Sequence, residues 1–346
     1  MRILITGGLG FIGSYLIIKL LKNKKNVILN LDKINYASNV SLSKVFVKNK
    51  NYQFKKTDIV NSETVEKNIL NFKPNYIFHL AAESHVDRSI DGPKVFIESN
   101  IIGTFNILEG TRKYLNNIKN FKNFVRIHHI STDEVYGDLE KNKKKFTEDT
   151  PYNPSSPYSA SKASSDHLVR AWGRTYDFPY LITNCSNNFG PYQFPEKFIP
   201  HTILCLLNNK KIPIYGNGKQ VRDWIYVEDH VDILIKLMSK KYKNQTFNIG
   251  GDNEIANINV VKKIIVILKN YILQKNLNRL IAYVSDRPGH DIRYAVNSSK
   301  IKKVLKIKTK NKFSQKLKHT ILWYINNKNF LKSFFKKYHM RRLGKS

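Results

Sequence analysis

Short apolar runs alternate with longer amphipathic segments through the first half of the chain. The apolar runs predict strands at residues 2–7, 26–32, 52–58, 75–82, 124–132 and 179–187. Segments with helical spacing of apolar residues lie between most of them, most clearly at 12–23, 62–72 and 103–115. Because the strands are apolar on both faces, helices must cover both sides of a parallel sheet. The pattern predicts an α/β fold with a doubly wound parallel sheet.

The pattern changes after about residue 189. Proline and glycine interrupt the later segments, as in GPYQFPEKFIP and DRPGHD, with helices between them. We expect a smaller C-terminal α/β lobe that faces the ends of the strands, and a further strand at 246–251 that returns to the sheet. The predicted parts are a sheet domain over 1–188 with a returning segment near 220–250, a lobe over most of 189–330, and a basic tail over 331–346.

Composition favours a soluble, cytoplasmic protein without a membrane partner. Hydrophobic residues make up 41% of the 346 residues, enough for a sizeable core. The two cysteines, Cys185 and Cys205, lie in apolar runs and cannot make a disulfide framework. The first strand follows Met1 directly, which leaves no room for a signal peptide. The most apolar later stretch, 259–273, is interrupted by lysines and is too short to span a membrane.

The charge is strongly positive, with 59 Lys and Arg against 26 Asp and Glu, a net of +33. Such a field attracts nucleic acid and anionic membranes. The lysines are spread along the chain among many asparagines and isoleucines, which indicates compositional drift more than a dedicated binding surface. We therefore expect no nucleic-acid partner, but expect the charge to help concentrate an anionic substrate.

The first predicted strand ends in a glycine-rich turn that opens a helix. In ITGGLGFIG, Gly7, Gly10 and Gly13 permit a tight turn and let the helix N-terminus approach a pyrophosphate. Asp32 ends the second strand, where a carboxylate accepts ribose hydroxyls and repels a 2′-phosphate. Asp58 closes the third strand, a position suited to the adenine amino group. The sequence predicts a Rossmann-type sheet that binds NAD in preference to NADP.

The fifth predicted strand ends in a hydroxyl and two adjacent carboxylates, Thr132, Asp133 and Glu134. Adjacent carboxylates repel each other and are costly to desolvate, so an isolated TDE sequence is ordinarily a solvated turn or a helix cap. Here the glycine turn and the helix that follows the strand place this strand end beside the nicotinamide. A catalytic role is therefore the better hypothesis.

That following helix carries Tyr158 and Lys162. Ser155, Ser156 and Pro157 before them form a good helix start, with serine caps and proline in the first turn. Residues four apart lie on one face of a helix. A neighbouring ammonium stabilises a phenolate, so we expect a lowered tyrosine pKa and proton transfer from a sugar or alcohol hydroxyl.

Seven ordered motifs resemble those of the extended short-chain dehydrogenases/reductases, and within them those of the nucleoside-diphosphoglucose 4,6-dehydratases. They are TGGLGFIGS, HLAAESHVDRSI, ISTDEVYGD, NPSSPYSASK, NCSNNFGPYQFPEKFIP, YGNGKQVRDWIYVEDH and DRPGHDIRYA. The match runs from residue 1 to about residue 330. The resemblance implies a Rossmann-type domain with NAD, a nucleotide-sugar substrate, foremost dTDP-glucose, and a homodimer joined through two helices per subunit.

The resemblance also implies a closed redox cycle. The sugar is oxidised at carbon 4, loses water across carbons 5 and 6, and receives hydride at carbon 6. Tyr158, with Thr132 and Lys162, is expected to deprotonate the carbon-4 hydroxyl. Glu134 is the expected base at carbon 5. Asp133 is the expected acid for the leaving hydroxyl, provided that burial and its charged neighbour raise its pKa.

Matched position by position, the resemblance implies two sets of binding residues. The cofactor set is Gly7, Gly10, Phe11, Ile12, Gly13, Asp32, Lys33, Asn35, Asp58, Ile59, Leu80, Ala81, Ala82, Ser84, Ser99, Tyr158, Lys162 and Asn188. The substrate set is Ser84, Thr132, Asn187, Glu196, Lys197, Pro213, Tyr215, Arg222, Asn257, Asp286 and His290. Cys185 is expected near the nicotinamide as a packing residue. No Cys or His spacing indicates a metal site.

Several alternatives stay open. UDP-glucose differs from dTDP-glucose at the base by one methyl group, which is worth only about 1–3 kcal/mol in a pocket. A nucleotide-sugar 4-epimerase needs the tyrosine, the lysine and NAD, but no elimination acid and base, so Asp133 and Glu134 favour a dehydratase. Asp32 argues against an NADP-dependent GDP-mannose dehydratase. A catalytically inactive NAD sensor or a basic scaffold is disfavoured because every expected catalytic position is filled.

Overall fold

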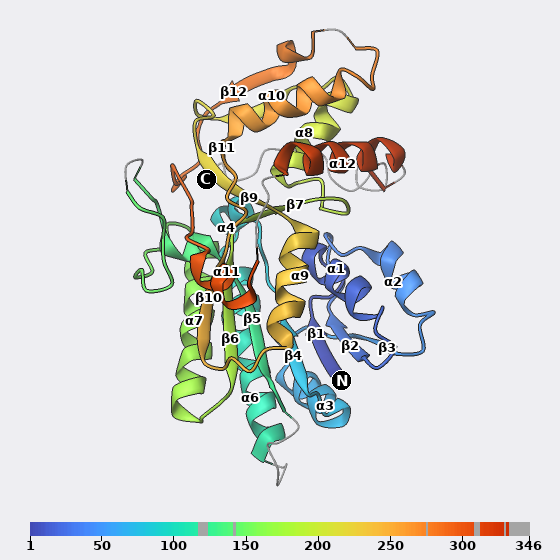
Figure 1. Cartoon of the computed structure of the whole chain (residues 1–346), viewed down its shortest axis with the longest axis vertical. Helices are drawn as coiled ribbons and strands as arrows, with labels where there is room; N and C mark the ends of the chain where they lie inside the picture. Colours follow the sequence, from blue (N-terminus) through green and yellow to red (C-terminus); the bar gives the residue numbers. More distant parts are fainter. Residues whose placement is uncertain (117–123, 141–142, 275, 308–311, 329, 332–346) are drawn as a thin grey trace.

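The computed structural model describes residues 1–116, 124–140, 143–274, 276–307, 312–328 and 330–331 (Figure 1). Among these residues, seven parallel strands form one sheet in the order β10-β6-β5-β4-β1-β2-β3. They are β1 (Arg2–Thr6), β2 (Val27–Asp32), β3 (Tyr52–Lys56), β4 (Tyr76–His79), β5 (Arg126–Thr132), β6 (Tyr180–Cys185) and β10 (Gln245–Ile249). The predicted strands and the returning strand are confirmed. The order reverses between β1 and β4, where doubly wound sheets bind ligands.

Helices cover both faces of this sheet, as the sequence predicts. The helices of this part are α1 (Phe11–Leu20), α2 (Val40–Phe46), α3 (Ser62–Phe72), α4 (Val86–Asp91), α5 (Lys94–Phe96), the π-helix η1 (Ile97–Ile102), α6 (Gly103–Asn116), the 3₁₀-helix η3 (Asp133–Tyr136), α7 (Pro157–Thr175), α9 (Val227–Met238) and α11 (Ser299–Leu305). α1, α2 and α9 pack on one face, and α3, α6 and α7 pack on the other.

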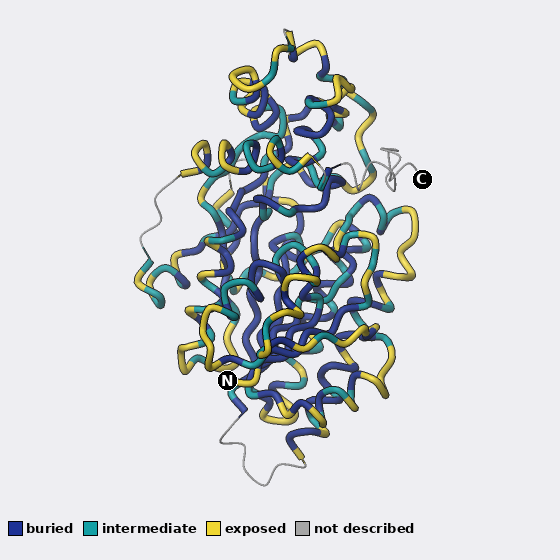
Figure 2. Tube along the Cα trace, turned by 90° about the vertical axis from the view of Figure 1, so that its right-hand side faces the viewer, coloured by how far each residue is buried: buried dark blue, intermediate teal, exposed yellow. Residues whose placement is uncertain are grey.

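Neighbouring residues of one strand face opposite helix layers. Ile3 and Ile5 of β1 pack with α1 and α9, whereas Leu4 packs with α3 and α6. Every residue of β5 is buried. Figure 2 shows the strands as a buried layer between more exposed helices. Covering on both faces explains why inner strands such as β1 and β4 are continuous apolar runs, whereas the edge strand β3 is partly exposed and alternates apolar with polar residues.

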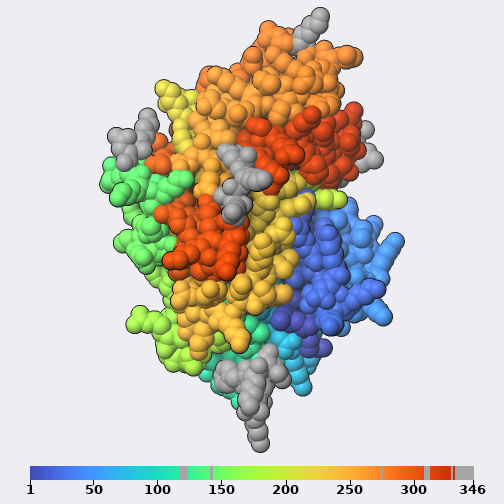
Figure 3. All heavy atoms as spheres, in the orientation of Figure 1, coloured from blue at the N-terminus to red at the C-terminus, as the bar shows by residue number. Residues whose placement is uncertain are grey.

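A second group of elements forms the upper part of the molecule in Figures 1 and 3. β7 (Asn187–Phe189), β9 (Val221–Tyr226) and β11 (Glu254–Ala256) form a three-stranded sheet, and β8 (Ile212–Tyr215) pairs with β12 (Ile281–Val284). The helices here are α8 (Phe198–Leu207), α10 (Asn257–Leu268), the 3₁₀-helix η4 (Leu277–Leu280) and α12 (Phe313–Asn326). Their buried apolar side chains form one cluster that extends from Phe189 to Leu331.

The chain passes repeatedly between the two parts. After β9 it returns to the sheet as α9 and β10, and later again as α11, where Ile301 packs with Leu181 and Phe247. The predicted boundary after residue 188 falls inside β7, and the predicted basic tail, apart from Leu331, lies outside the described residues. In the described part of the chain, no helix combines the length and the apolar character needed to cross a membrane.

Candidate active site

The turn after β1 lies directly against the backbone of the segment that follows β4. Gly7 has a φ of +71°, and a Cβ there would lie 2.7 Å from the Cα of Ala81. A Cβ at Gly13 would lie 2.7 Å from the Cα of Gly8. Since real Cβ atoms do not approach this closely, only glycine fits at both positions. The turn therefore leaves a bare backbone surface at the N-terminus of α1, as a pyrophosphate requires.

Asp32 braces this turn from the end of β2. Its Oδ2 accepts a hydrogen bond of 2.9 Å from the Leu9 N–H, and its Oδ1 accepts one of 2.9 Å from the Ile34 N–H. The Ser38 hydroxyl donates to the same Oδ1 over 3.2 Å. Burial raises the pKa of Asp32, and these hydrogen bonds act against the rise. The carboxylate is thus held at the cavity wall where ribose hydroxyls are expected.

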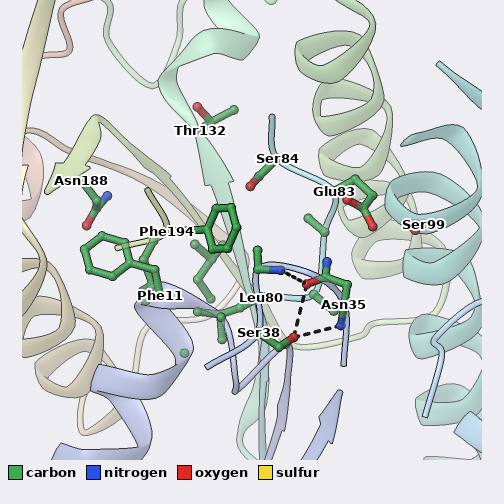
Figure 4. A pocket seen from close by; sticks show the side chains of 18 of the residues that line it. Phe11, Asn35, Ser38, Leu80, Glu83, Ser84, Ser99, Thr132, Asn188 and Phe194 are labelled. Carbon is green, nitrogen blue, oxygen red and sulfur yellow. Dashed lines mark hydrogen bonds between the residues drawn. The ribbon is translucent and has the colours of Figure 1, made fainter. Parts of the chain in front are cut away.

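A cavity of about 310 Å³ lies between the glycine turn, the ends of β2, β4 and β5, and the start of α7. Every residue of the predicted cofactor set lines it. Figure 4 shows Phe11 and Phe194 on one side of this cavity and Glu83 and Ser99 on the other. The glycine cradle, the ribose-facing carboxylate and the shape between these walls fit NAD. The sequence did not predict several of the lining side chains, including Tyr36, Glu83, Gln193 and Phe194.

The carboxylate pair lies where β5 becomes the short helix η3. Thr132 caps this helix, and its Oγ1 accepts a hydrogen bond of 3.3 Å from the Glu134 N–H. Asp133 is only 1% exposed. The Asp133 Oδ2 and the Glu134 Oε2 are buried and have no hydrogen-bond partner among the described residues. The stretch is therefore a helix cap in geometry, but Asp133 is buried, and Glu134 is half-buried at the cavity wall with its Oε2 shielded from solvent.

The two carboxylates differ in electrostatic surroundings. Burial, then the charge of Glu134, raises the pKa of Asp133 well above its ordinary value. Burial also raises the pKa of Glu134, but Arg287, Arg222 and Lys197 oppose the rise. The pKa of Asp133 is thus raised further than that of Glu134, which is the order that an acid at Asp133 and a base at Glu134 would need. Because they are adjacent, the pair titrates as a unit.

The helix α7 places Tyr158 and Lys162 at the same cavity. It begins at Pro157 after a capping box in which the Ser156 and Ser159 side chains bond each other's backbone, which confirms the predicted helix start. Tyr158 is 8% exposed and Lys162 is 4% exposed. The Lys162 Nζ donates a hydrogen bond of 2.9 Å to the Ile130 carbonyl.

The lowered Tyr158 pKa that the sequence predicts is not found in the protein alone. Burial, then the Glu134 carboxylate, raises the pKa of Tyr158 well above its ordinary value, and a hydrogen bond with Thr132 acts against the rise. Tyr158 and Lys162 lie at one cavity, as their spacing in the sequence indicates. The prediction of the Tyr158 pKa took no account of the desolvation of the ring or of the charge of Glu134. Cys185 lines the cavity as expected, and burial raises the pKa of its thiol to about 12.

A second cavity, of about 740 Å³, adjoins the first and is lined mainly by the second lobe. The two cavities share Ser84, Glu134, Asn187, Glu196 and Lys197. Pro213, Tyr215, Arg222, Asn257 and His290 of the predicted substrate set line the second cavity, and Thr132 lines the first. Asp286 lines neither. It is exposed to solvent and contacts a residue of the cavity wall, since its Oδ1 is 2.5 Å from the His290 Nδ1.

Cations predominate in this second cavity. Arg222 is buried and donates to the Asp291 carbonyl over 2.9 Å, with its guanidinium 4.4 Å from the centre of the Tyr294 ring. Arg287 pairs with Asp87 at 2.6 Å, and its Nε is buried without a hydrogen-bond partner among the described residues. Sequence reasoning missed Arg287, although it lies in the quoted DRPGHD motif. These guanidinium groups suit a diphosphate.

A metal centre was not expected from the sequence. Within the described ranges, no group of three or more His, Cys, Asp and Glu side chains is arranged to hold a metal ion.

The sheet order, the glycine turn and the Tyr158–Lys162 helix place the chain among Rossmann-type short-chain dehydrogenases/reductases. A family model described as GDP-mannose 4,6 dehydratase matches residues 4–320. A dTDP-glucose 4,6-dehydratase from Escherichia coli is 51% identical over 344 residues, which cover 95% of each chain. The chain therefore belongs to the dTDP-glucose 4,6-dehydratase family, within the group that this family model describes.

Two solved structures are similar over nearly the whole chain. The dTDP-glucose 4,6-dehydratase of Bacillus anthracis, in complex with NAD, has a TM-score of 0.85 at 40% identity and covers 96% of this chain and 99% of its own. The dTDP-glucose 4,6-dehydratase of Streptomyces venezuelae, with NAD and TYD bound, has a TM-score of 0.87 at 35% identity and covers 95% of this chain and 98% of its own.

Proposed function

We propose that this chain dehydrates dTDP-glucose to the 4-keto-6-deoxyglucose nucleotide, with NAD as its cofactor. The observation that carries the proposal is the pair of adjacent carboxylates at the cofactor cavity, a buried Asp133 and a half-buried Glu134. Oxidation alone needs only Tyr158 and Lys162. A second acid and base with opposed protonation states are needed for elimination of water.

When bound, NAD supplies a reversible acceptor of hydride. Tyr158 takes the proton of the carbon-4 hydroxyl, while Lys162 and Thr132 orient the phenolic oxygen. The ketone at carbon 4 acidifies the proton on carbon 5, and Glu134 removes it. Asp133 gives its proton to the hydroxyl that leaves carbon 6. Glu134 returns its proton to carbon 5, and the proton that Tyr158 took passes to Asp133, so the net change is the loss of one water and the enzyme regains its starting state.

We propose that the second lobe, over most of residues 189–330, holds the nucleotide. The excess of guanidinium and ammonium groups in its cavity supports a diphosphate there. The charges of Arg222 and Arg287 also stabilise the ionised form of Glu134, because they oppose the rise of its pKa. Substrate binding and the state of the elimination base are thus linked through the same cations.

We propose a homodimer formed through α5, η1, α6 and the end of α7. Val95, Ile97, Ile102 and Phe105 are exposed apolar side chains on consecutive elements, and Tyr176 is exposed at the end of α7. Such a patch is unfavourable in water and favours burial against a second copy.

We also propose a cytoplasmic location, because both cysteines are buried free thiols, as in reducing compartments.

The function is tested by incubating the protein with NAD and either dTDP-glucose or UDP-glucose, followed by mass spectrometry. Loss of one water from the nucleotide sugar, without accumulation of NADH, is the expected result. Faster turnover of dTDP-glucose supports dTDP-glucose as the substrate, whereas faster turnover of UDP-glucose assigns UDP-glucose. Conversion to the galacto isomer at unchanged mass would establish an epimerase and refute the proposal.

A further inference from the structure

One fully buried acid next to the catalytic residues is not used by the proposed mechanism. Asp166 lies on α7 one helical turn after Lys162 and is not exposed to solvent. Its Oδ2 accepts hydrogen bonds from the Ser131 hydroxyl at 2.9 Å and from the Tyr152 hydroxyl at 2.8 Å. Its Oδ1 lies 3.1 Å from the His129 Nε2. A carboxylate in such a place is costly unless charges or hydrogen bonds compensate its desolvation.

Asp166 belongs to a continuous set of contacts between α7 and β5. His129, Ile130 and Ser131 are consecutive on β5, and each contacts α7. His129 faces Asp166, the Ile130 carbonyl accepts a hydrogen bond of 2.9 Å from Lys162, and Ser131 donates to Asp166. The next residues along the chain are Thr132, which ends β5, and the two active-site carboxylates, which begin η3. These contacts thus set the position of the catalytic helix against the catalytic strand end.

The titratable and charged groups around Lys162 come from four elements: His79 on β4, His129 on β5, Cys185 on β6, and Tyr158, Asp166 and Arg170 on α7. Burial lowers the pKa of His129 to about 4 and that of His79 well below its ordinary value. Burial raises the pKa of Cys185 to about 12 and also raises the pKa of Tyr158. These shifts favour the neutral forms of the histidines, Cys185 and Tyr158, whereas the pKa shifts of Asp166 and Arg170 favour their charged forms.

Arg170 is partly engaged elsewhere, since it donates to the Tyr152 hydroxyl over 2.7 Å and lies 4.8 Å from the centre of that ring. We propose that Asp166 is a positioning residue that holds α7 in register with β5 and supplies the counter-charge that keeps Lys162 protonated. Burial lowers the pKa of Lys162, and Asp166 is the largest influence against this lowering. Without it, the ammonium keeps one backbone carbonyl as its hydrogen-bond partner and loses its proton at lower pH.

The first test does not depend on catalysis. Asp166→Asn is made in the natural chain and in a Lys162→Met chain, and the unfolding midpoint in denaturant is measured for each. If the Asp166 carboxylate and the Lys162 ammonium neutralise each other, Asp166→Asn lowers the unfolding midpoint more in the natural chain than in the Lys162→Met chain. Equal losses in both would overturn the inference. Should Asp166→Asn alone fail to fold, a folded double variant supports the inference and an unfolded one contradicts it.

The second test rests on the proposed function, because it uses dehydration as its readout. Turnover needs protonated Lys162, so kcat falls as the pH rises through the pKa of this lysine. In Asp166→Asn, the alkaline limb of the profile is expected at lower pH by about one unit, which is a tenfold loss at a fixed pH on that limb. Tyr152→Phe is the control. It removes the hydrogen bond from the Tyr152 hydroxyl to the Asp166 Oδ2 but keeps the charge of Asp166, so the alkaline limb of its pH profile is expected to stay in place.

A uniform fall in kcat with an unmoved limb in Asp166→Asn would contradict the counter-charge and indicate a purely structural role. If the natural enzyme released no water from either nucleotide sugar, the proposed function would fail. The unfolding comparison would still decide the role of Asp166.

Discussion

Tyr36 donates a hydrogen bond of 2.9 Å to Glu196 and thereby joins the wall of the cofactor cavity to that of the substrate cavity. The other carboxylate oxygen of Glu196 accepts a hydrogen bond of 3.1 Å from the Arg88 Nε. The Arg88 guanidinium lies 4.0 Å from the centre of the Tyr36 ring. These three residues come from the segment after β2, from α4 and from the second lobe. We therefore expect the two sites to respond to each other.

Tyr36→Phe keeps the ring but removes a hydrogen bond to a charged group, a contact worth about 1.5–3 kcal/mol. We expect NAD to bind about tenfold more weakly and the KM for the nucleotide sugar to rise, because both cavities lose a shared wall contact. Calorimetric titration with NAD and steady-state kinetics measure the two effects. Tyr283→Phe, at an exposed position on β12, is the matched control. Unchanged binding of both ligands would argue against this coupling.

Asp133→Asn keeps the shape of the side chain but cannot supply an acidic proton. Elimination is expected to slow by about 10²–10⁴-fold, the usual contribution of a general acid, while oxidation at carbon 4 slows far less. Single-turnover absorbance measurements should then show that NADH forms and persists. Glu134→Gln provides the comparison for the base. Equal slowing of oxidation and elimination in Asp133→Asn would contradict the acid role.

The raised pKa of Asp133 also predicts a pH dependence of stability. Above the unfolded pKa of about 4, the unfolded chain loses a proton that the folded chain retains. Stability therefore falls as the pH rises through this window, and the full loss is present above the folded pKa. Asp133→Asn abolishes this loss. Its melting temperature, relative to the natural chain, is expected to rise from about pH 4 to about pH 8.

The control for that series is Asp149→Asn, the same substitution at an exposed carboxylate. A constant difference for Asp133→Asn across the same range would mean that Asp133 does not hold a proton in the folded state.

The glycine turn offers a matched pair of substitutions. A Cβ at Gly13 would lie 2.7 Å from the Gly8 Cα, whereas a Cβ at Gly10 would lie 3.2 Å from the Gly7 carbonyl oxygen. Gly13→Ala is expected to lower stability by about 1–3 kcal/mol, as overpacking does, and Gly10→Ala by much less. Unfolding in urea without added cofactor separates this effect from NAD binding. Equal losses would show that the backbone of the turn adapts freely.

The proposed dimer is tested at its apolar patch. Ile102→Glu places a charge among apolar side chains of two subunits, and we expect the molecular mass in light scattering to fall to that of a monomer. Leu273→Glu is the control, because Leu273 is fully exposed on the second lobe. A monomeric natural chain, or a variant that stays dimeric, would place the interface elsewhere.

Most of the main sheet could be predicted because its inner strands are buried on both faces, so each contains an apolar run that is visible locally, whereas the edge strand β3 is largely exposed. The small strands of the second lobe could not be predicted in this way. β7 and β11 have three residues each, and both pair with β9 from distant parts of the chain. Their existence depends on tertiary pairing, which leaves no periodic signal in such short segments.

The candidate site likewise contains residues that local patterns predict and residues that only the folded chain brings together. The glycines, Asp32 and the Tyr158–Lys162 spacing are local patterns, and all of them line the predicted cavity. The Arg287–Asp87 pair joins residues 200 positions apart, so only the folded chain brings it to the site. The pKa of Tyr158 was mispredicted for a related reason, since burial and Glu134 act through the fold and not through helix spacing.

The packing of α11 under β10 limits how this fold can diversify. A hybrid made by joining the first 250 residues of this chain to a relative would replace Ile301, which packs with Leu181 and Phe247. The second lobe is therefore not an exchangeable cassette. Exchange at a single crossover therefore also changes the packing of the sheet that positions the cofactor, whereas a point substitution in a cavity wall leaves that packing intact.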